Sequence, residues 1–266
     1  MRVDTVRTDA FTMDYLCFGE GKNVLVILPG LSVQKVLGFA EAIADAYNLL
    51  TKDFTIYLFE RKNELPAVYK ITDMAEDTVC AMRTLGLEKV CLFGASQGGM
   101  IAMQIAVRYP ELVKRMIVGS TSAYISEEKN DVVKEWISLA KQGDAKELYL
   151  TFGEAINPPA VFEQLKDAYA AAGETVTAEE LARFVILAEG MAGFNLLDEL
   201  KKIACPILVI GSKDDLVLGA EASVQIAEHL NPEMPHELYL YEGYGHAAYD
   251  LAPDYRERML AFLRCK

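Results

Sequence analysis

Ser96 lies in a glycine-rich stretch that could make it a nucleophile. The stretch Gly94-Ala95-Ser96-Gln97-Gly98 follows the apolar run 90–93 and precedes an apolar helical pattern at 99–108. A strand that turns sharply into a helix strains the residue at its tip, and side chains two positions on either side of it would collide. Glycines at these two positions remove the collision, and the helix aims free N–H groups at the same place. The stretch therefore predicts an exposed serine hydroxyl.

A serine hydroxyl is a weak nucleophile unless a base takes its proton. The chain has three histidines, His229, His236 and His246. The first falls near the end of a helical pattern and the second in a polar turn, so ordinary surface positions explain both. His246 follows the last predicted strand in Gly243-Tyr244-Gly245-His246, at the same carboxyl edge of the sheet as Ser96. We therefore expect His246 to be the base.

The imidazole in turn needs a carboxylate that holds its tautomer and stabilises its cation. Asp214 and Asp215 both follow the strand predicted at 207–210, so either would lie at the correct edge of the sheet. Spacing alone does not choose between the two aspartates.

The elements that must position these residues alternate along the chain. Short apolar runs predict strands at 24–28, 54–59, 90–93, 116–118, 207–210 and 237–241. Helical patterns occupy 72–85, with Thr72 as a possible N-cap, and 99–108, 220–230 and 254–263. Strands that are apolar on both faces and separated by helices predict a parallel sheet covered on both sides. The segments 3–7 and 11–18 predict an antiparallel hairpin at the sheet edge.

The alternation breaks between about residues 126 and 189, where amphipathic helical segments follow one another. Gly143, Pro158-Pro159 and Gly173 divide them. We therefore assign residues 1–123 and 196–266 to one core domain and 124–195 to an inserted helical cap. Most aromatic side chains of this cap should form its own core, and a few could line an apolar pocket.

Composition and charge narrow the class of protein. The chain has 266 residues, 52% apolar and 24% charged, which is typical of a globular domain. A net charge of −13 disfavours nucleic acid and anionic membranes as partners. Five cysteines without paired spacing give neither a disulfide framework nor a zinc signature. With a polar beginning and no membrane-length apolar run, we expect a cytoplasmic protein. Its oligomeric state is not readable from the sequence.

Four motifs, in this order, are similar to those of the α/β-hydrolase superfamily. They are Leu28-Pro29-Gly30-Leu31, Gly94-Ala95-Ser96-Gln97-Gly98-Gly99, Gly211-Ser212-Lys213-Asp214 and Gly245-His246. The order of serine, aspartate and histidine is also that of the family. The resemblance runs from the third strand to the last helix. It implies a mostly parallel central sheet of about eight strands flanked by helices, with an inserted helical cap.

The resemblance also implies roles for individual residues. Ser96, Asp214 and His246 would be catalytic, because family members place the acid three residues after the glycine that ends the seventh strand. Asp215 remains the alternative acid. The backbone N–H groups of Leu31 and Gln97 would form the oxyanion hole. Many relatives have His-Gly where this chain has Pro-Gly, a departure that a backbone donor tolerates.

The implied reaction is acyl transfer to Ser96 followed by hydrolysis, and it needs no metal or organic cofactor. The expected partner is a small-molecule substrate, a small or medium apolar ester. The same residues also serve hydrolysis of lactones, thioesters, carbon–carbon bonds and peptides, and cofactor-free peroxidation. Coenzyme A thioesters are disfavoured as substrates because the sequence has no cluster of basic residues that could bind the phosphates of coenzyme A. A small-molecule-binding relative without turnover and a scaffold acting through its acidic surface are the alternatives from other classes.

Overall fold

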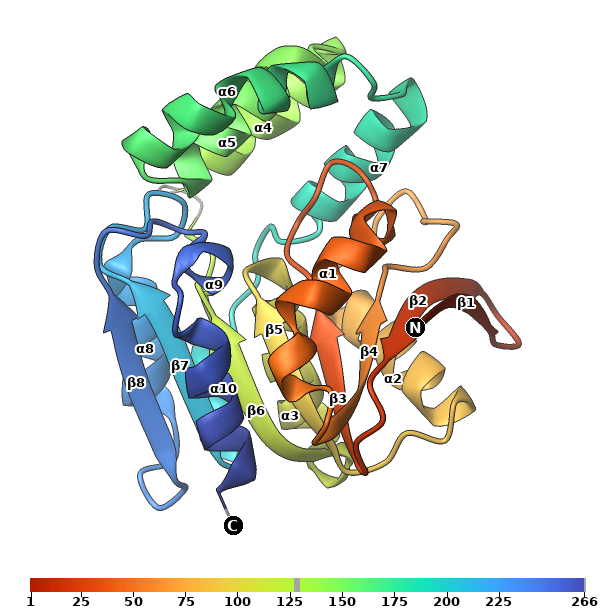
Figure 1. The fold of residues 1–266 in the computed structure, drawn as a ribbon, viewed down its shortest axis with the longest axis vertical. Helices are drawn as coiled ribbons and strands as arrows, with labels where there is room; N and C mark the ends of the chain where they lie inside the picture. The colour runs from red at the N-terminus through yellow and green to blue at the C-terminus, as the bar shows by residue number, and fades with distance from the viewer. Residues whose placement is uncertain (127–129, 266) are drawn as a thin grey trace.

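The computed structural model describes residues 1–126 and 130–265. Within them, eight strands form one sheet in the order β1-β2-β4-β3-β5-β6-β7-β8 (Figure 1). β1 (Arg2–Arg7) and β2 (Thr12–Phe18) form an antiparallel hairpin at one edge, and β2 runs antiparallel to β4. The remaining strands are parallel: β3 (Asn23–Leu28), β4 (Phe54–Phe59), β5 (Val90–Ala95), β6 (Val113–Gly119), β7 (Ile207–Ser212) and β8 (His236–Tyr241). The expected sheet is confirmed.

Successive residues of the strands face two separate apolar cores, because side chains alternate across a strand. In β3, Val26 and Leu28 belong to one core, and Leu25 and Ile27 to the other. The first core contains buried residues of α2 (Ile71–Thr84), α3 (Gln97–Arg108) and α8 (Ala220–His229). The second lies under α1 (Ala40–Ala46) and α10 (Tyr255–Arg264), which Figure 1 shows in front of the sheet. Helices therefore cover both faces, as the apolar strands predict.

In the described part of the chain, four α-helices follow β6 and precede β7. They are α4 (Asp131–Gln142), α5 (Ala145–Ile156), α6 (Pro159–Gly173) and α7 (Ala178–Glu189). Figure 1 shows α4, α5 and α6 lying across one end of the sheet. The segments that lead into and out of this insertion pair with each other, since Ile125 N–H donates to Phe194 O at 2.9 Å and Leu196 N–H to Ala123 O at 2.8 Å. On this pairing we propose that the inserted cap spans residues 124–195.

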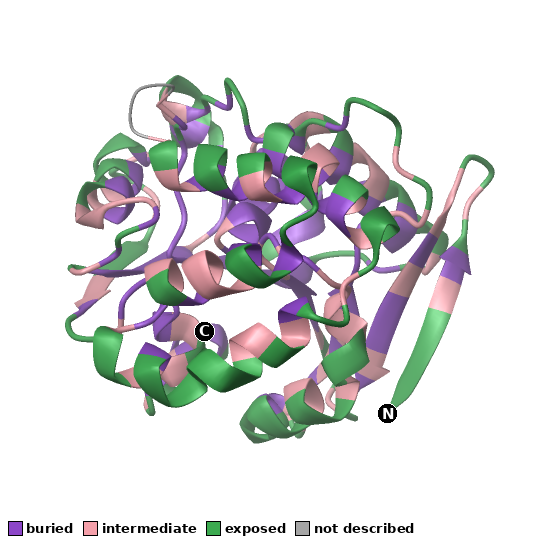
Figure 2. Ribbon diagram, turned by 90° about the horizontal axis from the view of Figure 1, so that it is seen from above, coloured by how far each residue is buried: buried purple, intermediate pink, exposed green. Residues whose placement is uncertain are grey.

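Short elements complete the chain. They are the 3-10 helices Val36–Phe39, Asn48–Leu50, Pro110–Leu112 and Leu197–Lys202, and the helix α9 (Ala248–Leu251). The sequence analysis did not predict α1, whose apolar face is small: Ala40, Ile43 and Ala44 pack against the second core, and no residue of the helix is fully buried. Seen from above, the strands are largely buried between helices whose outer surfaces are exposed (Figure 2). In the two described ranges, no helix combines the length and apolarity that crossing a membrane requires.

Two predicted helix starts are wrong. Helix α2 begins at Ile71, so Thr72 lies inside its first turn and is not the N-cap. The N–H of Lys70 instead donates to the Asp73 carboxylate at 2.9 Å, which satisfies one of the free groups at the helix start. Helix α3 begins at Gln97 rather than near residue 99. It starts earlier because the whole change of direction after β5 is made at the single residue Ser96.

Replacing a side chain at the middle of the sheet should destabilise the protein strongly. Leu25 is fully buried in β3, which pairs with β4 on one side and β5 on the other. We expect Leu25→Ala to lower the free energy of unfolding by about 2–5 kcal/mol, measured by urea denaturation. The exposed Val3 of β1 is the control, and Val3→Ala should change it by less than about 0.5 kcal/mol. Equal effects of the two changes would contradict the two-core description.

Candidate active site

Ser96 occupies the turn between β5 and α3, and its backbone is strained. Its φ of 51° and ψ of −123° lie outside the regions that side-chain-bearing residues ordinarily adopt. Hydrogen bonds hold this conformation from both sides. Ser96 N–H donates to Gly119 O at 2.8 Å, and Ser96 O accepts from Thr121 Oγ1 at 2.6 Å. Such strain persists only where the surroundings over-determine it, and it is common at functional sites.

The two glycines of the motif remove the collisions that the sequence predicted. A Cβ on Gly94 would lie 2.3 Å from Gly98 O, and a Cβ on Gly98 would lie 1.9 Å from Leu28 O. Both distances are far below van der Waals contact. The turn at Ser96 therefore requires glycine at both positions: Gly94 because it faces Gly98 across the turn, and Gly98 because it also packs against the end of β3.

His246 lies in the loop after β8 and is 3% exposed. Its Nδ1 is 2.8 Å from Asp215 Oδ2. The other carboxylate oxygen of Asp215 accepts the N–H groups of Val217 at 2.8 Å and Leu218 at 3.0 Å. The imidazole is thus oriented by a buried carboxylate that is itself fixed by the backbone after β7.

The expectation that Asp214 orients the histidine is wrong, and its neighbour Asp215 takes that place. Asp214 Oδ1 accepts from Ser212 Oγ at 2.7 Å and Gly243 N–H at 3.0 Å, and its Oδ2 accepts from Gly245 N–H at 3.1 Å. Consecutive residues of the turn direct their carboxylates to different partners, and both oxygens of Asp214 are used by backbone and hydroxyl donors. Asp214 instead holds the glycine loop that leads to His246.

The surroundings of Asp215 favour its ionised form. Burial by itself raises the pKa of this carboxyl group, because it penalises the charge. The charge and hydrogen bond of His246, with the N–H groups of Leu218 and Val217, outweigh burial and lower the pKa below its usual value. Asp215 is therefore a carboxylate at neutral pH, the form that accepts a hydrogen bond from imidazole.

Ser96 and His246 both line one small cavity between the sheet and the insertion. The rest of its wall is almost entirely apolar and comes from Leu31, Met100, Ile125, Val133, Trp136, Phe152, Ile156, Met191, Val217, Leu218 and Tyr249. The cavity measures about 20 Å³, and holding one water molecule takes roughly 10–15 Å³. The structure thus brings the predicted nucleophile and base to one enclosed, apolar space.

Both segments expected to supply the oxyanion hole also reach Ser96. Gln97 is the first residue of α3, so its N–H has no acceptor within the helix. Leu31 lines the cavity. A Cβ on Gly30 would lie 3.1 Å from Ser96 Cβ, which places the loop after β3 directly against the serine. The roles of Leu31 and Gln97 stay predictions.

The other two histidines lie on the surface. His229 and His236 are exposed, and each Nδ1 is within hydrogen-bond distance of a nearby carbonyl, Gln225 O at 2.8 Å and Met234 O at 2.9 Å. Neither histidine lines the cavity that contains Ser96.

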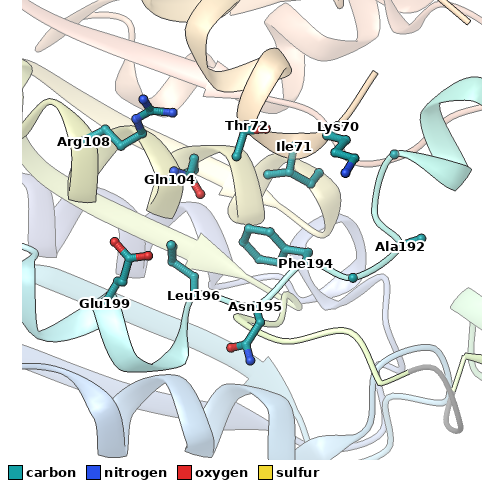
Figure 3. Close-up of a pocket in the computed structure, with 12 residues that line it drawn as sticks. Lys70, Ile71, Thr72, Gln104, Arg108, Ala192, Phe194, Asn195, Leu196 and Glu199 are labelled. Carbon is teal, nitrogen blue, oxygen red and sulfur yellow. The ribbon is translucent and has the colours of Figure 1, made fainter. Parts of the chain in front are cut away.

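A larger, open cleft lies elsewhere and does not contain these residues (Figure 3). It measures about 510 Å³ and lies where the start of α2 meets the chain leaving the insertion, with Lys70, Gln104 and Phe194 in its wall. We take the small cavity as the candidate active site, because a strained serine and an oriented imidazole meet there. Among residues 1–126 and 130–265, no cluster of three or more His, Cys, Asp or Glu side chains is placed to hold a metal ion.

The sequence analysis missed Arg61, which lies beside the serine turn. Its side chain is 4% exposed, and its Nη2 donates to Pro29 O at 2.8 Å and to Gln97 Oε1 at 3.2 Å. In the sequence, Arg61 is one of several charged residues after β4, which is typical of an exposed loop. Only its position directly after a parallel strand, at the edge where Ser96 is expected, could have singled it out.

Comparisons with known proteins define the class to which this chain belongs. A family model for the alpha/beta hydrolase fold matches residues 23–155, which is half of the chain. The chain belongs to this family.

Individual relatives are distant but similar over most of their length. Serine hydrolase BPHL of Mus musculus is 26% identical over 257 residues, which cover 88% of this chain and 80% of that protein. Putative carbamate hydrolase RutD of Pseudomonas syringae pv. syringae is 25% identical over 265 residues, which cover 94% and 96%. The crystal structure of MGS-M2, an alpha/beta hydrolase enzyme from a Medee basin deep-sea metagenome library, superposes with a TM-score of 0.87. It is 22% identical and covers 99% of this chain and 98% of that one.

The hydrogen bond between His246 and Asp215 should fix the imidazole tautomer. Because the carboxylate accepts from Nδ1, we expect the neutral ring to carry its proton there, with Nε2 free. Nitrogen-15 NMR of the two ring nitrogens measures this. Asp215→Asn should abolish the preference for Nδ1, whereas Asp214→Asn, the adjacent control, should preserve it. The reverse pattern would restore Asp214 as the orienting acid.

Proposed function

We propose that this protein is a serine hydrolase that cleaves a small or medium apolar carboxylic ester through an acyl-enzyme on Ser96. One observation carries the proposal. A serine on a strained turn and a histidine oriented by a buried carboxylate line the same apolar cavity. Membership of the alpha/beta hydrolase fold family and relatives named as hydrolases support it.

The proposed reaction has two symmetrical halves. His246 Nε2 takes the proton of Ser96 Oγ as this oxygen attacks the ester carbonyl carbon, and Asp215 stabilises the imidazolium through Nδ1. The N–H groups of Leu31 and Gln97 hold the negative oxygen of the tetrahedral intermediate. The imidazolium then protonates the leaving alcohol. His246 then takes a proton from water as the water oxygen adds to the acyl carbon, and it returns this proton to Ser96 Oγ as the carboxylic acid leaves.

The cavity wall favours an apolar acyl group. A free carbamate or a peptide presents amide groups that lose hydrogen bonds to water on burial, and few polar groups of the wall replace them. Because the cavity holds about one water molecule, side chains must shift to admit even a short acyl chain. Lactones share the ester carbonyl and are the second substrate class that this wall would accept.

We also infer a reducing compartment, which fits the predicted cytoplasmic location. All five cysteines are free, and unpaired thiols are typical of reducing environments. Burial raises the pKa of the Cys91 thiol to about 11 and that of Cys205 to about 12. These two side chains are therefore protonated apolar groups of the core at neutral pH.

An activity-based probe tests the proposed nucleophile directly. We expect a fluorophosphonate to label the wild-type protein on Ser96, located by peptide mass spectrometry, and a panel of p-nitrophenyl esters to be hydrolysed. Ser96→Ala should abolish labelling. Asp215→Asn should slow it by roughly 10²–10⁴-fold, because the imidazole loses its oriented tautomer.

Asp214→Asn is the adjacent control. Its one remaining side-chain oxygen can still accept from Ser212 Oγ and Gly243 N–H, and only the bond from Gly245 N–H is lost. It should slow labelling by less than about tenfold. A ligand-binding protein without turnover predicts no reaction at Ser96, and so does a scaffold that acts through its acidic surface. Absence of both labelling and hydrolysis in the folded wild-type protein would therefore reject the proposal.

Widening the cavity should change the preferred acyl chain length. Trp136 is 3% exposed, lines the cavity and packs against Phe152 in a tilted arrangement with ring centroids 4.5 Å apart. We expect Trp136→Phe to raise kcat/KM for p-nitrophenyl octanoate relative to acetate by about tenfold, because the smaller ring leaves room for additional methylene groups. Initial rates on the two esters measure this ratio.

Phe162 gives the control within the same insertion. It is 6% exposed and packs against Tyr169, away from the cavity wall. Phe162→Leu should leave the ratio of the two esters unchanged although it removes a similar amount of buried surface. If both variants shift the ratio equally, Trp136 does not set chain length.

A further inference from the structure

Arg61 is a buried cation at the end of β4 whose contacts converge on the serine turn. Its Nη2 donates to two oxygens, Pro29 O at 2.8 Å and Gln97 Oε1 at 3.2 Å. Its Nε has no hydrogen-bond partner within the described chain. One nitrogen of a single side chain thus bridges the loop after β3 and the first residue of α3.

These two acceptors belong to the segments proposed to supply the oxyanion hole. Pro29 lies two residues before Leu31, and the second acceptor is the side chain of Gln97 itself. The same amide continues the chain of contacts, since Gln97 Nε2 donates to Leu187 O of α7 at 2.7 Å. A continuous set of hydrogen bonds therefore connects the loop after β3, Arg61, the serine turn and the insertion.

Burying this guanidinium costs desolvation free energy, so a charged residue at this position needs a structural or functional explanation. Burial lowers the pKa of Arg61 to about 10, so the group is still charged at neutral pH. Its hydrogen-bond acceptors are neutral oxygens rather than carboxylates. The neighbouring Glu60 accepts from Leu37 N–H at 3.0 Å and lies 3.7 Å from Arg183. A well-packed apolar side chain would fill this space at a lower desolvation cost.

We propose that Arg61 is a positioning residue that sets the spacing of the two oxyanion-hole donors, an inference that rests on the proposed serine hydrolase function. The Nη2 of its planar guanidinium, which donates to both segments, fixes the loop that carries the Leu31 N–H relative to the turn that carries the Gln97 N–H. The buried positive charge also favours the negative charge that develops on the substrate oxygen.

This role predicts a loss of rate rather than of substrate binding. The oxyanion exists only in the transition state and the intermediate, so donors that are badly spaced stabilise these species less while the ground state binds as before. A misplacement of about 1 Å typically lowers the rate by about 10²-fold. The apolar wall that would bind the acyl chain does not include Arg61.

The test uses Arg61→Gln and Arg61→Lys in the full-length protein. With p-nitrophenyl butyrate we expect Arg61→Gln to lower kcat by about 10–100-fold and to leave KM within about threefold of the wild type. Butylboronic acid forms a tetrahedral adduct on the serine, so its inhibition constant should rise by the same factor as kcat/KM falls. Arg61→Lys keeps a cation with N–H donors on a shorter, unbranched head group, so it should recover part of the rate.

Lys62→Gln is the matched control on the same loop. Lys62 pairs with Asp77 at 2.9 Å and contacts neither segment of the site, so its loss should leave kcat, KM and boronic acid affinity unchanged. Thermal unfolding checks that each variant is folded. If Arg61→Gln does not fold, Arg61→Lys decides by the same criterion, a lower kcat at unchanged KM.

The outcomes separate the two proposals. Arg61 variants whose kcat and boronic acid affinity stay within about twofold of the wild type overturn the positioning role while Ser96 labelling stands. A rise in KM with unchanged kcat also overturns it, because it assigns Arg61 to substrate binding. A folded wild-type protein that neither labels nor hydrolyses esters overturns the serine hydrolase proposal, and the role of Arg61 with it.

Discussion

The hydrogen bond between His246 and Asp215 is the interaction on which the candidate site depends. It joins two loops at the same edge of the sheet, and both side chains are almost fully buried. A buried imidazole and carboxylate are stable there only as a pair, since either alone would leave an unsatisfied polar group or charge. Asp215 is fixed by two backbone N–H groups, and Asp214 fixes the loop that carries His246. The two adjacent aspartates thus have different roles: Asp215 orients the imidazole of His246, and Asp214 holds the loop that carries His246.

The strained backbone conformation of Ser96 is held in place by the neighbouring strands of the sheet. Strand β5 lies between β3 and β6, and the backbone of Ser96 is bonded to residues that directly follow β6 or end it, Thr121 and Gly119. The loop after β3 closes on the turn from the other side, where Gly98 touches Leu28. A conformation that the residue would not adopt alone is therefore imposed by three neighbouring strands. Central parallel strands, which the apolar runs predict, are what such a turn requires.

The sequence predicted the features that follow from a residue pattern, namely the strands and the positions of the serine and the histidine. It did not predict the features that depend on where a particular side chain points. Strand positions follow from apolar runs, and the serine and histidine follow from motifs at strand ends. The choice between Asp214 and Asp215 depends on the backbone angles of one turn, which spacing does not encode. Arg61 shows a second limit. A charged residue among charged neighbours resembles a solvated one, and its burial arises from packing against segments more than 30 residues away, at Pro29 and Gln97.

The substrate is the property that the sequence predicts least, because the cavity wall comes partly from the insertion. The core supplies Ser96, His246 and Leu31 to the cavity, whereas the insertion supplies Trp136 and Phe152. The insertion is also bonded to the core at the site, through Gln97 to Leu187 and through Ala247 N–H to Ile156 O at 2.9 Å. The proposed chemistry therefore resides in segments with recognisable motifs. We expect substrate choice to depend on the helices of the insertion. Their sequence pattern shows that one face of each helix is apolar, but it does not determine the shape of the cavity that these faces line.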